Sequence, residues 1–195
     1  MQISEFLAED PGSTALGPIP EPQGPRTLVL GLGNDILTDD AVGLWLARRL
    51  QQVFYDFPFI EVRETCEMGL ALLDHLVGFE QAFIVDSIQT GKVDPGVLHV
   101  LDPCTLARLA GPTPHFLGVG EVLALGQQLG LEMPGRVRIF AVEVADPFSL
   151  GTSLSPAVEE AFPGIVDRIR TVVLSSCPEG IRCFTDREHE EQTAR

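Results

Sequence analysis

Apolar residues follow two alternating patterns along this chain. Short runs rich in aliphatic and aromatic residues, bounded by turn-forming residues, predict β-strands at residues 27–32, 59–63, 82–85, 96–101 and 137–142. Between these runs, apolar residues recur every three or four positions, which predicts a helix that begins near Asp40 and further helices at residues 70–77, 117–129 and 156–173. Because strands and helices alternate, the predicted fold class is α/β, a three-layer α/β/α sandwich around a mostly parallel, twisted sheet.

Both ends of the chain lack these patterns. Residues 1–26 contain five prolines together with glycines and acids, a composition that buries too little apolar surface to offset the entropy of ordering. We therefore expect a flexible N-terminal extension. Residues 176–195 are polar and highly charged, which favours a disordered C-terminal tail. Residues 27–175 then form a single domain, large enough for one substantial core.

Charge and composition exclude several classes of partner. The 195 residues carry a formal net charge of −15, and Lys92 is the only lysine, whereas nucleic-acid binding needs clustered Lys and Arg. No apolar run approaches the ~20 residues that cross a bilayer, and the N-terminus has acids where a signal peptide is basic. We therefore expect no nucleic-acid or membrane partner and a cytoplasmic location. The four cysteines lack zinc-site spacing and are expected to be reduced thiols.

The most informative motif is the turn after the first strand, residues 31–43, with the sequence GLGNDILTDDAVG. A dinucleotide-binding turn has glycine at its first, third and sixth positions, but the sixth position here is Ile36. Asp39 and Asp40 stand at the helix start, where they would repel a pyrophosphate. The sequence of this turn therefore favours binding of a cation or of a polar peptide group. The simpler alternative is that Thr38 or Asp39 only caps the helix.

Asp86 is a further acidic residue at a predicted strand end. It follows the third strand, and right-handed crossovers would place that strand beside the first. In open α/β sheets the binding crevice lies outside the carboxyl ends of the strands, where the winding reverses. Asp86 and Asp40 are therefore candidates for one shared site. The alternative is that Asp86 caps the turn of residues 87–90.

His115 is the candidate third ligand. It precedes the helix predicted at residues 117–129, and a helix N-terminus favours the neutral imidazole, which binds a metal or accepts a proton. A solvated or locally hydrogen-bonded histidine is the alternative reading. Together, Asp40, Asp86 and His115 form an oxygen, oxygen, nitrogen set suited to Ni²⁺ or Zn²⁺ with water in the open positions.

At these residues the chain resembles the hydrogenase maturation endopeptidases. The resemblance runs from about residue 27 to about residue 173, through GLGNDILTDDAVG, ETCEMGLALLDHL, FIVDSIQTG followed by PGVLHVLD, and TPHFLGVGEVLAL. It implies a phosphorylase/hydrolase-like version of the predicted sandwich. It also implies an endopeptidase of aspartyl type that removes the C-terminal extension from the nickel-loaded large-subunit precursor of a nickel-iron hydrogenase, as a checkpoint on nickel insertion.

The same resemblance implies roles for individual residues. Asp40, Asp86 and His115 bind the metal and are also the catalytic residues, with no division of roles among them. Nickel arrives with the precursor, which is the expected partner, and other divalent ions are able to substitute. Many relatives have Glu where this chain has Asp40. We assign substrate contacts to residues of the turns that follow the first two strands: Gly33, Asn34, Asp39, Thr65 and Gly69.

Two other functions stay open at this point. The chain has no G-x-S-x-G or H-E-x-x-H motif, and Cys66 lies beside Glu64 and Glu67, acids that disfavour a thiolate nucleophile. A nucleotide-binding oxidoreductase would account for the glycine turn, but the third glycine is missing. A non-catalytic escort that binds nickel through the same three ligands is the other alternative.

Overall fold

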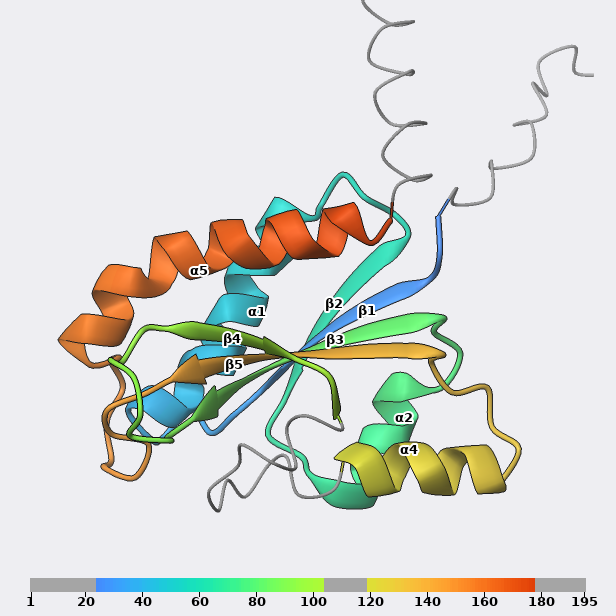
Figure 1. The fold of residues 1–195 in the computed structure, drawn as a ribbon, viewed down its shortest axis with the longest axis horizontal. Helices are drawn as coiled ribbons and strands as arrows, with labels where there is room; N and C mark the ends of the chain where they lie inside the picture. Colours follow the sequence, from blue (N-terminus) through green and yellow to red (C-terminus); the bar gives the residue numbers. More distant parts are fainter. Residues whose placement is uncertain (1–23, 104–118, 178–195) are drawn as a thin grey trace, which may run out of the picture.

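The computed structural model describes residues 24–103 and 119–177. Strands within these ranges form one twisted five-stranded sheet in the order β2-β1-β3-β5-β4 (Figure 1). The strands are β1 (Thr27–Leu32), β2 (Ile60–Thr65), β3 (Gln81–Ile88), β4 (Leu98–Leu101) and β5 (Arg136–Glu143). Neighbouring strands run parallel, except that β4 is antiparallel to β5. The predicted mostly parallel sheet is confirmed.

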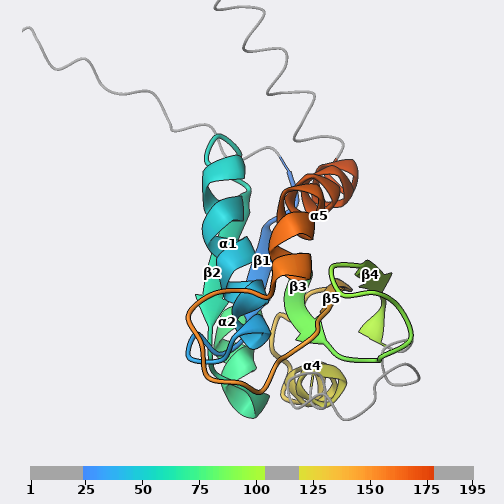
Figure 2. The ribbon, with the colours of Figure 1, turned by 90° about the vertical axis from the view of Figure 1, so that its left-hand side faces the viewer.

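Helices cover both faces of this sheet (Figures 1 and 2). One face carries the 3₁₀ turn η1 (Asp39–Ala41) with helices α1 (Val42–Val53) and α5 (Pro156–Ser175), and the other carries η2 (Gly69–Ala71), α2 (Leu72–Leu76) and α4 (Val119–Gln128). The predicted three-layer sandwich is confirmed. In the part of the chain that the structure describes, no helix has the length and apolarity needed to cross a membrane.

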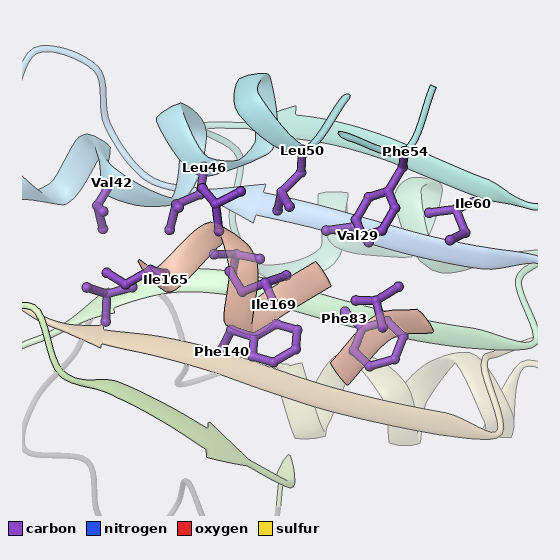
Figure 3. Close-up of a cluster of buried hydrophobic side chains, with 14 of the residues drawn as sticks. Val29, Val42, Leu46, Leu50, Phe54, Ile60, Phe83, Phe140, Ile165 and Ile169 are labelled. Atoms are coloured by element: carbon purple, nitrogen blue, oxygen red, sulfur yellow. The ribbon is translucent and has the colours of Figure 1, made fainter. Parts of the chain in front are cut away.

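The sheet separates two apolar clusters, which explains why β1 is apolar throughout. Val29 lies in the cluster with α1 and α5, whereas Leu28 and Leu30 lie in the cluster with α2 and α4. In the first cluster, the rings of Phe83 and Phe140 stack with centroids 5.7 Å apart (Figure 3). Side chains alternate between the faces of a strand, so a central strand that is covered on both sides needs no polar face.

Two glycines of the motif at residues 31–43 let α1 pack closely on the sheet. A Cβ at Gly43 would overlap the carbonyl oxygens of Leu32 and Val85, and a Cβ at Gly31 would overlap the carbonyl oxygen of Gly43. The absence of a side chain at these positions brings the start of α1 against the carboxyl ends of β1 and β3. These glycines therefore have a packing role that needs no bound dinucleotide.

Three local interpretations are wrong. The third strand does not end before Asp86, because Asp86, Ser87 and Ile88 continue to pair with β5. The alternative in which Asp86 caps a turn at residues 87–90 is wrong for the same reason. The first helix has no side-chain cap from Thr38 or Asp39, since hydrogen bonds to a distant loop engage both side chains.

Candidate active site

The candidate site lies at the carboxyl ends of β1 and β3, where the winding of the sheet reverses. Strand β2 pairs with one edge of β1 and β3 with the other, which is the arrangement that creates a crevice in open α/β sheets. Gly31 of β1 pairs with Val85 of β3, so Asp86 lies level with the end of β1. The predicted proximity of these two strand ends is confirmed.

Ser87 joins the two predicted acidic ligands. Its hydroxyl donates a hydrogen bond of 2.8 Å to Oδ1 of Asp40, and its backbone N–H donates one of 2.7 Å to Oδ1 of Asp86. Asp40 is 5% exposed and Asp86 is fully buried. Burial disfavours charged carboxylates unless hydrogen bonds or a cation compensate. The hydrogen bonds from Ser87 supply part of that compensation to both acids, and a cation bound at this pair stays a prediction.

Asp39 has a different environment from its neighbour Asp40. Its buried carboxylate accepts hydrogen bonds from the backbone N–H groups of Ala145, Asp146 and Ser155, at 3.1, 2.9 and 2.7 Å. These residues begin and end the loop between β5 and α5, so Asp39 fixes both ends of that loop. The structure thus gives Asp39 an anchoring role, and its substrate contact stays a prediction.

The same loop forms a short ladder with the residues that precede Asp39. Thr38 N donates to the carbonyl oxygen of Ser149 at 2.9 Å, Gly151 N donates to that of Ile36 at 3.1 Å, and Leu37 forms an antiparallel bridge with Leu150. We call residues 36–38 and 146–151 the loop pair. Figure 2 looks onto this edge of the molecule, with the loop between β5 and α5 crossing in front of the start of α1.

Glu143, at the end of β5, is a buried acid that the sequence interpretation missed. Its carboxylate accepts hydrogen bonds from Thr90 N, Thr90 Oγ1 and Gly91 N at 2.7–2.8 Å, and lies 3.3 Å from His99 Nε2. Burial alone would raise the pKa of Glu143, but the hydrogen bonds from Thr90, Gly91 and His99 lower it below its ordinary value. Glu143 thereby ties the loop after β3 to β4 and β5. The signal that predicted Asp86, an acid directly after an apolar run, was also present at Glu143.

The remaining predicted substrate contacts surround the same edge of the sheet. Gly33 is buried against the backbone of Asp40, and Asn34 N donates to the Asp40 carbonyl oxygen at 3.4 Å. Thr65 ends β2 and its Oγ1 accepts the Glu67 N–H at 3.0 Å, whereas Gly69 is exposed. Gly33 and Asn34 therefore lie against the backbone of Asp40 and Thr65 lies opposite Leu32 at the end of β1, and the contact of all four positions with substrate stays a prediction.

His115, the third predicted ligand, lies outside the described residues. Within residues 24–103 and 119–177, no group of three or more His, Cys, Asp and Glu side chains is arranged to hold a metal ion. The described residues therefore bring together two members of the predicted set, Asp40 and Asp86, through Ser87. The complete three-ligand set stays a prediction.

Comparisons with known proteins agree on one family. The sequence model described as "Hydrogenase maturation protease" matches residues 45–172, a range that includes Asp86 and begins after Asp40. The "Hydrogenase 2 maturation protease" of Escherichia coli (strain K12) is 27% identical over 158 residues, which cover 80% of this chain and 95% of that protein. The "Hydrogenase expression/formation protein HupD" of Rhizobium leguminosarum bv. viciae is 23% identical over 182 residues, 89% of each chain.

A solved structure shares this fold. The hydrogenase maturating endopeptidase HybD from E. coli superposes with a TM-score of 0.66 and 26% sequence identity, over 77% of this chain and 93% of that one. The likeness therefore extends over nearly the whole length of the known enzyme.

Proposed function

Because this chain belongs to the hydrogenase maturation protease family, we propose that it removes the C-terminal extension from the nickel-loaded large-subunit precursor of a nickel-iron hydrogenase. The family is one of endopeptidases, so the chain is a peptidase. The observation that carries the finer proposal is the pairing of two buried carboxylates, Asp40 and Asp86, through Ser87 at the carboxyl edge of the sheet.

Nickel enters this proposal as part of the substrate. Carboxylate oxygens and an imidazole nitrogen suit a divalent first-row metal, and Asp40 with Asp86 supplies the oxygen ligands, with His115 proposed as the nitrogen ligand. A precursor that has received its nickel would bind the carboxylates through the ion, whereas an unloaded precursor would meet two negative side chains. Cleavage would thereby follow metal insertion. Other divalent ions of similar coordination are expected to substitute.

The proposed chemistry is hydrolysis of one peptide bond by water. A cation held by Asp40, Asp86 and His115 would orient the precursor and would supply the charge that polarises the scissile carbonyl or the attacking water. One carboxylate of the pair accepts the proton that water loses, and the leaving amine takes up a proton when the bond breaks. Ser87 hydrogen-bonds to Oδ1 of both acids, so their orientation is set before the precursor arrives. Because an aspartate accepts the proton, the proposed reaction is aspartate-dependent.

We place this reaction in the cytoplasm. Cys66 and Cys177, the cysteines in the described part of the chain, are both free thiols. Free thiols are typical of a reducing compartment. Detection of the processed large subunit in a cytoplasmic fraction before export or membrane attachment would test this placement.

The function is tested by the intact mass of the precursor. We expect a nickel-loaded precursor to lose one C-terminal peptide with the unmodified protein and to keep its full mass with Asp86→Asn, which retains shape but loses the charge. Asp56→Asn, at an exposed position after α1, is the matched control and should process normally. Processing by Asp86→Asn at the unmodified rate would overturn the site assignment. A stable complex with the unmodified protein and no loss of mass would favour a non-catalytic escort.

A further inference from the structure

We propose that the loop pair, residues 36–38 and 146–151, is the docking surface for an apolar part of the C-terminal segment of the nickel-loaded precursor. This inference rests on the proposed function and names the part of this protein that holds the partner while its scissile bond reaches the carboxylates.

The loop pair is held in place by hydrogen bonds. The ladder between its two segments is supported by Thr38 Oγ1, which donates to the carbonyl oxygen of Ser149 at 3.0 Å. Within the longer segment, Oδ1 of Asp146 accepts the N–H groups of Phe148 and Ser149 at 3.2 and 2.9 Å. Asp39 fixes the loop at both ends. A surface organised in this way loses little conformational entropy on binding.

Three large apolar side chains project from the loop pair into solvent. Ile36 is 59% exposed, Phe148 is 69% exposed and Leu150 is 80% exposed. Solvent-exposed apolar residues that are concentrated on an ordered element mark an interaction surface more often than isolated ones do. Burial of these side chains against a partner would favour binding, because it removes apolar surface from water.

The position of the loop pair connects it to the candidate active site. Asp39, which anchors the loop pair, is the residue next to Asp40 in the chain and in η1. A segment that lies on the loop pair is therefore beside the carboxylates. Other strongly exposed apolar residues, such as Tyr55 after α1 and Leu129 after α4, lie at the opposite edge of the sheet, because both helices run back from the carboxyl edge to the amino edge.

The negative charge around the loop pair favours the precursor over a second copy of this chain as the molecule that binds there. Asp35 is exposed beside the loop pair, and hydrogen bonds from Ser149 and Phe148 lower the pKa of Asp146, which keeps it negative. A second copy would bring a further net charge of −15 to this surface, and like charges oppose association. In the proposed function the precursor brings Ni²⁺ to the carboxylates beside this surface, so it offers a cation where a second copy would offer further acids.

The test measures precursor binding and cleavage with matched variants. Phe148→Ser combined with Leu150→Ser removes two of the three exposed apolar side chains of the loop pair, and Tyr55→Ser combined with Leu129→Ser removes side chains of similar exposure at the opposite edge. Affinity for the nickel-loaded precursor is measured in an Asp86→Asn background, so that bound precursor is not consumed. KM and kcat are measured without that substitution.

The proposal predicts that the loop-pair variant binds the precursor at least about tenfold more weakly, with a raised KM, an unchanged kcat and an unchanged melting temperature. The opposite-edge variant should match the unmodified protein.

Equal affinities for the two double variants would overturn the docking surface while leaving the peptidase intact. Weaker binding by the loop-pair variant with no cleavage by the unmodified protein would overturn the peptidase and leave the docking surface. A wild-type dimer that the loop-pair substitutions convert to monomer would show that a second copy is the occupant, and would also overturn the proposal.

Discussion

The Ser87 hydroxyl donates a hydrogen bond of 2.8 Å to Oδ1 of Asp40, and this bond joins β3 to η1 inside the candidate active site. The adjacent carboxylate of Asp39 turns away to the loop between β5 and α5. Two neighbouring acids of the same type thus have separate tasks. Asp39 holds the loop between β5 and α5, while Asp40 is linked to Asp86 through Ser87.

Removal of the Ser87 hydroxyl should slow precursor processing. Ser87→Ala leaves the Asp40 carboxylate without its donor from β3, and a hydrogen bond to a charged group contributes about 1.5–3 kcal/mol. We expect a fall in kcat of about tenfold or more and a weaker affinity of the isolated protein for Ni²⁺ in a competition titration. Ser87→Thr, which keeps the hydroxyl, should have a higher kcat and a higher Ni²⁺ affinity than Ser87→Ala. A Ser87→Ala variant with unmodified kcat and Ni²⁺ affinity would refute the positioning role.

Substitution of Asp39 should destabilise the fold. Asp39→Ala leaves three partly buried backbone N–H groups without their acceptor. A fully buried donor left unsatisfied costs about 1–3 kcal/mol, and water can reach these donors in part. We expect the free energy of unfolding to fall by about 1–3 kcal/mol in total in urea denaturation. The control is Asp35→Ala at an exposed position, which should change the free energy of unfolding by no more than about 0.5 kcal/mol. Equal stability of the two variants would be incompatible with the anchoring role of Asp39.

Glu143 should make stability depend on pH on the acid side. Its pKa is lower in the folded state than its ordinary value, so its ionised form stabilises the fold above the pKa of an unfolded glutamate, about 4.3. This contribution is lost as pH falls through the folded pKa. Glu143→Gln should therefore be less stable than the unmodified protein at pH 7, and the difference should shrink at lower pH. Chemical denaturation at several pH values measures this difference in the free energy of unfolding. A difference that stays constant with pH would contradict the lowered pKa of Glu143.

Addition of a single methyl group at Gly43 should displace α1 from the sheet. A Cβ at this position overlaps the carbonyl oxygens of Leu32 and Val85, and overpacking of this kind costs about 1–3 kcal/mol. Gly164→Ala in α5 is the matched control, because nothing lies within 4 Å of its added Cβ. It should raise stability by about 0.5–1 kcal/mol. If both substitutions changed the melting temperature in the same direction, the close packing of α1 would not be the reason for Gly43.

The sequence predicted the layers of the fold because these depend on local patterns. The apolar run at residues 27–32 is β1 as observed, with side chains that enter both clusters. The last predicted helix begins at Pro156 as observed. The extent of β3 was not predictable in this way, because its last residues belong to the strand only through pairing with β5.

The candidate site was predictable in part for a similar reason. The position of Asp86 and Asp40 at neighbouring strand ends follows from topology, which the alternation of elements indicates. The environment of Asp39 depends on residues more than 100 positions away in the chain, such as Ala145 and Ser155, and that of Asp40 depends on Ser87, 47 positions away. No local pattern contains that information, so the helix-cap interpretation was wrong.

Nickel-gated cleavage is tested by the intact mass of the large-subunit precursor after incubation with this protein, with nickel loaded and with nickel absent. We expect the nickel-loaded precursor to lose its C-terminal peptide and the nickel-free precursor to keep its full mass. Equal cleavage of both forms would contradict nickel gating, and full mass in both samples despite a stable complex would contradict the peptidase assignment.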